Sequence, residues 1–135
     1  MDTVVAPASH AAALWAGCLL FVLLVLSALV VRQRQRHGVS LGDGGIEALA
    51  RATRAFGNAT EYIPAGLGAL AILALVGARP LLVHGVGVLL LLGRVAHAWG
   101  LSTHAGLSPG RTVGMILTWL AFLVAGVLLL FYSLF

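Results

Sequence analysis

RATRAFGNATEYIP, residues 51–64, places four strongly polar side chains directly before a long apolar run. An α-helix advances about 100° per residue. On such a helix one face, an arc of about 80°, carries Arg51, Arg54, Asn58 and Glu61. Polar groups at the edge of lipid are costly unless they face a protein interior or an aqueous cavity. Two interpretations follow: the side chains form a structural ion network, or they form a recessed site for a charged ligand.

The composition of the chain is that of an integral membrane protein. Of its 135 residues, 61% are hydrophobic and 9% are charged, and the mean hydropathy is +1.06. Soluble domains carry roughly 25% charged residues. The net charge of +4 arises without lysine, and the arginines flank apolar segments, which is a membrane pattern and not a nucleic-acid-binding one. We therefore expect one domain over residues 1–135 and no nucleic-acid partner.

Four apolar segments can each supply the roughly 20 residues that a bilayer-spanning helix needs. They predict an all-α membrane protein, a bundle of four transmembrane helices in up-down topology, with helices over about 9–36, 46–77, 80–101 and 110–134. The first segment is too long for the hydrophobic region of a signal peptide, and Asp2 is the only charge before it. We expect this segment to be retained as a helix.

The arginines predict the orientation of the bundle. Arg79 lies on one side of the membrane, and the opposite side holds Arg32, Arg34, Arg36, Arg51, Arg54, Arg94 and Arg111. Arginine-rich ends of transmembrane segments face the cytoplasm. We therefore expect both termini on the non-cytoplasmic side.

The third and fourth helices add polar residues to the same side. Arg94 and His97 share a helical face, and Arg111 begins the fourth helix. The topology is expected to gather into one layer Arg32, Arg51, Arg54, Asn58, Glu61, Arg94, His97 and Arg111. Glu61 is the one carboxylate of this layer, so a ligand with several carboxylates would compensate its guanidinium groups. Anionic lipid headgroups explain Arg34 and Arg36.

The sequence indicates no metal site and no nucleophile of its own. Its five histidines are scattered over both sides, and Cys18 is the single cysteine. The helical layer lacks aspartate, so a Ser-His-Asp arrangement is not credible there. Any nucleophile is expected to arrive with the ligand.

The pattern Arg51-x-x-Arg54-Ala55-x-x-Asn58-x-x-Glu61-x-x-Pro64 resembles the signature of the MAPEG family, membrane-associated proteins in eicosanoid and glutathione metabolism. The stretches LGDGG (41–45) and GRVAH (93–97) resemble its small bacterial members, and the resemblance covers nearly the whole chain. It implies a four-helix protomer, a homotrimer in the bacterial inner membrane, and glutathione bound between neighbouring protomers near the cytoplasmic side.

The resemblance also implies a role for each polar residue. Arg111 would be catalytic and stabilise the glutathione thiolate, since a thiol of pKa about 8.5 is mostly protonated at neutral pH and a guanidinium favours its anion. Glutathione would be bound by Arg32, Arg51, Arg54, Asn58, Glu61, Arg94, His97 and Thr112.

The implied activity is that of a glutathione S-transferase or a glutathione-dependent peroxidase of detoxification, with glutathione as co-substrate, no metal, and lipophilic electrophiles that reach the site from membrane lipids. Family enzymes commonly carry a tyrosine seven residues after the arginine that matches Arg94, and here that residue is Leu101. This departure leaves open a non-catalytic glutathione- or lipid-binding protein of the same fold. A small multidrug-type transporter is a third reading, disfavoured because cationic neighbours would oppose cation exchange at Glu61.

Overall fold

The chain is all-helical over residues 7–135, the part that the computed structural model describes. The helices within this part are α1 (Ala8–His37), α2 (Glu47–Leu75), α3 (Pro80–Thr103) and α4 (Pro109–Leu134). Each is long and apolar enough to cross a membrane, which confirms the prediction of four membrane-spanning-type helices. Residues 1–6, with Asp2 among them, lie outside the described part.

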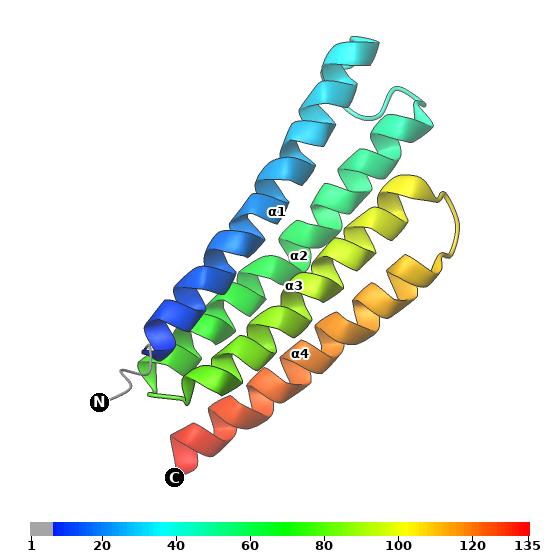
Figure 1. Cartoon of the computed structure of the whole chain (residues 1–135). Helices are drawn as coiled ribbons and strands as arrows, with labels where there is room; N and C mark the ends of the chain where they lie inside the picture. The colour runs from blue at the N-terminus through cyan, green and yellow to red at the C-terminus, as the bar shows by residue number, and fades with distance from the viewer. Residues whose placement is uncertain (1–6) are drawn as a thin grey trace, which may run out of the picture.

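The four helices lie side by side as a bundle (Figure 1). The start of α1, the α2–α3 turn and the end of α4 lie at one end, and the α1–α2 and α3–α4 connections lie at the other (Figure 1). Helix α3 packs against each of the other three, whereas α1 and α4 do not touch each other. The α1–α2 and α3–α4 connections therefore bring the polar starts of α2 and α4 to the same end.

Local sequence explains where the helices stop and start. Gly38 adopts a left-handed conformation with φ of 65° after α1, and its N–H donates to the Arg34 carbonyl, a common helix C-terminal cap. Pro80 opens α3 at a position where the missing N–H costs nothing. Ser108 caps α4, its hydroxyl oxygen accepting the N–H of Arg111 at 3.4 Å. This cap fixes the first turn of α4, which carries Arg111.

Helices α3 and α4 approach closely because glycines face each other across their interface. A Cβ atom on Gly114 would lie 2.4 Å from the backbone nitrogen of His97 and 2.6 Å from the carbonyl oxygen of Gly93. Small residues permit this backbone approach in membrane bundles. The contact places the His97 segment of α3 directly against the first turns of α4.

Candidate functional site

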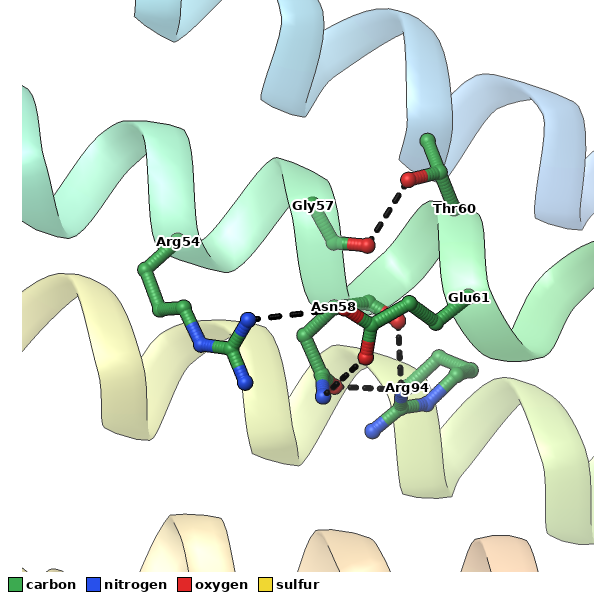
Figure 2. Close-up of polar contacts among 6 residues, drawn as sticks. All are labelled: Arg54, Gly57, Asn58, Thr60, Glu61 and Arg94. Atoms are coloured by element: carbon green, nitrogen blue, oxygen red, sulfur yellow. Dashed lines mark hydrogen bonds and ion pairs between the residues drawn. The ribbon is translucent and has the colours of Figure 1, made fainter.

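Three polar side chains of α2 form a connected group midway along the helix (Figure 2). Arg54 Nη1 lies 3.4 Å from Glu61 Oε1, and Asn58 Nδ2 donates to Glu61 Oε2 at 3.5 Å. The Arg54 and Glu61 side chains keep 63% and 53% of their surface exposed in the protomer. An exposed ion pair of this kind contributes about 0–1 kcal/mol to stability, so both groups remain available to a ligand.

Arg94 of α3 contacts this group on its buried side. It is 1% exposed, and its Nη1 donates to Asn58 Oδ1 at 2.8 Å and to the Asn58 carbonyl at 3.5 Å. Its guanidinium also lies 5.0 Å from the centre of the Tyr62 ring, a cation–π contact. Figure 2 shows Asn58 between Glu61 and Arg94. Asn58 therefore joins a buried cation to the exposed carboxylate.

A second group lies where α3 meets the first turns of α4. Here a cavity of about 230 Å³ is lined by His97, Leu107, Arg111, Thr112, Met115, Ile116 and Trp119. Arg111 Nη1 donates to the Gly106 carbonyl at 2.7 Å, which holds the guanidinium against the α3–α4 loop. His97 is only 7% exposed. Met115 connects the two groups, because its sulfur also lies 3.9 Å from Arg94 Nη2.

Arg51 and Arg32 stand apart from both groups. The guanidinium of Arg51 pairs with Glu47, one turn earlier on α2, and lines a different cavity with Gln33 and Ser102. Arg32 is exposed and forms no hydrogen bond to any other residue within 7–135. Because α1 does not touch α4, one protomer does not bring Arg32 to Arg111.

Arg34, expected from the sequence to face lipid headgroups, has partners within the protein. Its Nη1 donates to the carbonyls of Gly42 at 3.0 Å and Val39 at 3.4 Å. It also lines, together with Arg54, a cavity of about 460 Å³ beside the α1–α2 loop. The direction of those loop carbonyls depends on left-handed glycines such as Gly42, with φ of 68°, and cannot be read from the spacing of the arginines. Tyr62 was missed as well, although its position next to Glu61 and one turn after Asn58 pointed to it.

The arrangement suits an organic zwitterion. Guanidinium groups bind carboxylates, often through two parallel hydrogen bonds, and Glu61 can accept hydrogen bonds from an ammonium group. Within residues 7–135 no group of three or more His, Cys, Asp or Glu side chains is close enough together to hold a metal ion. The cavity beside Arg111 has mostly apolar walls, which suit a lipophilic reactant.

Comparison with known proteins identifies the family. The model of the MAPEG family matches residues 12–131. The inner membrane protein YecN of Escherichia coli strain K12 is 39% identical over 112 residues, which is 83% of this chain and 84% of the relative. YecN of Escherichia coli O6:H1 strain CFT073 matches to the same extent. With a family match over most of its length and four membrane-spanning-type helices, the chain is a membrane protein that belongs to the MAPEG family.

Proposed function

We propose that the protein binds glutathione and activates its thiolate toward lipophilic electrophiles, as a glutathione S-transferase or a glutathione-dependent peroxidase. The observation that carries the proposal is the group formed by Arg54, Asn58 and Glu61, backed by the buried Arg94. Two charged side chains more than half exposed in the N-terminal half of a membrane-spanning-type helix are costly in lipid. A zwitterionic tripeptide would compensate both charges.

In this proposal the charged ends of the ligand bind to the exposed residues of the α2 group, which consists of Arg54, Asn58 and Glu61. Arg54 binds a carboxylate, and Glu61 accepts hydrogen bonds from the ammonium group. Asn58 and Arg94 act as positioning residues, because the hydrogen bond of 2.8 Å between them fixes the amide that faces Glu61. His97 and Thr112 line the cavity beside Arg111.

Arg111 supplies the activating charge. A guanidinium beside the sulfur lowers the free energy of the thiolate relative to the thiol and so raises the fraction of nucleophile at neutral pH. In the transferase reaction the thiolate attacks an electrophilic carbon, a sulfur–carbon bond forms, and the leaving group departs with its electron pair. In the peroxidase reaction the thiolate attacks the terminal hydroperoxide oxygen, the O–O bond breaks, and the lipid alkoxide departs and takes up a proton to become an alcohol. A second glutathione thiol then attacks the resulting sulfenic acid to give a disulfide and water.

The proposal includes a homotrimer with an up-down helix topology in the bacterial inner membrane and both termini on the non-cytoplasmic side. Two features of the protomer support an assembled site. Arg54 and Glu61 stay open in the single chain, and Arg32 on α1 is exposed and separated from α4. In a trimer, Arg32 of a neighbouring protomer would complete the carboxylate contacts. Arg51, paired with Glu47, would stabilise the start of α2 and act only indirectly.

A non-catalytic binding protein is the alternative, and Leu101 favours it. This residue takes the place of the tyrosine common in family enzymes, and its hydrocarbon side chain has no hydroxyl group to offer a ligand. It is also only 6% exposed. A protein of this kind would keep the α2 group and bind glutathione without useful turnover.

Glutathione protection and turnover distinguish these functions. We would measure the unfolding temperature of the detergent-solubilised protein with millimolar glutathione, and then the conjugation of a chlorodinitrobenzene and the reduction of a lipid hydroperoxide. Protection with turnover supports the enzyme, and protection that Arg54→Ala abolishes, without turnover, supports the binding protein. If glutathione gives no protection and no turnover, both functions are wrong.

A further inference from the structure

The end of the bundle opposite the candidate site holds a second cavity, of about 550 Å³. It lies where the α2–α3 turn meets the last turns of α4, and both segments lie at the same end of the bundle (Figure 1). Its walls are Gly77, Arg79, Leu82, Leu128, Phe131 and Tyr132. The cavity combines one guanidinium and one phenol with apolar side chains, and it shares no residue with the cavities beside Arg54 or Arg111.

The protein holds the rim of this cavity in a fixed geometry. The backbone N–H of Arg79 donates to the Tyr132 hydroxyl at 3.2 Å, which ties the α2–α3 turn to the end of α4. The turn itself is closed by Gly77, with φ of 75°, and by a hydrogen bond of 3.0 Å from the Ala78 N–H to the Leu73 carbonyl. Arg79 is therefore presented by a packed turn and not by a loose loop.

The guanidinium of Arg79 has no anionic partner among residues 7–135. Its side chain is exposed, and neither of the ion pairs found in this part of the chain involves it. The acidic side chains of this part belong to the α1–α2 loop and to α2 up to its midpoint: Asp43, Glu47 and Glu61. Arg79 is also the one arginine at its end of the bundle. Within the described part of the chain, no acidic side chain therefore compensates the positive charge of this cavity.

We propose that this cavity is a binding site for an anionic phospholipid of the leaflet that faces the chain termini. The phosphate pairs with Arg79, and the first methylenes of an acyl chain pack against Leu82, Leu128 and Phe131. The depth fits, because Arg79 and Tyr132 stand at helix ends, where arginines and tyrosines meet headgroups. The charge of Arg79 favours an anionic lipid. A headgroup with a net negative charge compensates the guanidinium, whereas a zwitterionic headgroup already carries a cation that pairs with its own phosphate.

Lipid titration of the purified full-length protein tests the site without reference to glutathione. Phosphatidylglycerol or phosphatidylcholine with identical acyl chains is added in mixed micelles, and bound lipid is counted by native mass spectrometry. The matched variants are Arg79→Gln and Arg79→Lys, since the second keeps a positive charge at the same exposed position. We expect the wild type and Arg79→Lys to prefer phosphatidylglycerol, and Arg79→Gln to lose about fivefold in affinity, the contribution of one cation near a charged lipid surface.

Two further arms separate a lipid from a small anion. Leu82→Phe narrows the cavity and leaves the charge in place, so it is expected to weaken lipid binding as well. Glycerol 3-phosphate carries the same phosphate without acyl chains and is expected not to displace the lipid. The proposal is wrong if Arg79→Gln binds phosphatidylglycerol as tightly as the wild type does, or if glycerol phosphate displaces the lipid at an equal concentration.

Discussion

Arg94 Nη1 donates to Asn58 Oδ1 at 2.8 Å across the α2–α3 interface, and the arginine is 1% exposed. A buried guanidinium next to α2 thus has a neutral amide as its closest partner, while the nearest carboxylate, Glu61, contacts the other side of that amide. Hydrogen bonds therefore connect the buried guanidinium of Arg94 on α3, through the amide of Asn58, to the Glu61 carboxylate on the exposed face of α2. Arg94 therefore shapes the candidate site through Asn58 and has almost no surface with which to touch a ligand.

Removing one partner of this pair should cost more stability than removing both. Asn58→Leu leaves the buried guanidinium without its best acceptor, and we expect a loss of about 1–3 kcal/mol. The double variant Asn58→Leu/Arg94→Met replaces both polar groups by apolar ones and should recover much of that loss. Thermal unfolding in detergent measures the stability of the wild type, the two single variants and the double variant. A double variant that loses as much as the sum of the two single variants would show that the pair is not coupled.

The helices were predictable from hydropathy, because lipid admits few alternatives to a helix as a span. The existence and membrane-spanning type of all four follow from the apolar segments. The packing face of α1 was not predictable, since its exposed and buried positions carry the same residue types: Leu19 and Leu26 are buried, whereas Leu20 and Leu24 are exposed. Only the neighbouring helices decide which leucines face inward.

The candidate site was predictable as a set of residues and less so as a set of contacts. The spacing of Arg54, Asn58 and Glu61 gave their common face, and the structure joins them by hydrogen bonds. The pairing of Arg51 was also visible in the sequence, because Glu47 lies four residues earlier, the spacing of a helical ion pair. The cavity that Arg34 of α1 and Arg54 of α2 line together was not predictable, because it depends on the path of the connecting loop.

Gly114 is predicted to be indispensable for the α3–α4 contact. In Gly114→Ala the new methyl group would lie 2.4 Å from the His97 nitrogen, so the helices must separate. We expect a loss of about 1–3 kcal/mol, the usual cost of overpacking. Gly126→Ala is the matched control on the same helix, because a Cβ there meets nothing within 4 Å. Thermal unfolding compares the two, and equal stability of both variants would contradict the close packing.

Glu61→Gln should separate stability from ligand binding. The Arg54–Glu61 pair is more than half exposed, so we expect the unfolding free energy to change by less than about 1 kcal/mol. Glutathione binding should fall at least tenfold, because the ammonium group loses its anionic partner. Glu47→Gln breaks the ion pair with Arg51 on the same helix and should leave binding unchanged. Calorimetric titration measures the glutathione affinity of both variants. Equal losses in affinity would show that Glu61 does not bind the ligand directly.

Arg111→Ala should raise the pKa of the bound glutathione thiol. A guanidinium next to the sulfur stabilises the thiolate, so the anion forms at a lower pH in the wild type. Without that charge the titration should return toward about 8.5, the ordinary value for a thiol, and less thiolate absorbance should be seen at neutral pH. Binding should remain, because Arg54 and Glu61 are intact, and Arg111→Lys should restore part of the thiolate because it keeps the positive charge. Ultraviolet titration of the glutathione complex measures the shift. A variant that binds glutathione and titrates as the wild type does would show that the activating charge lies elsewhere.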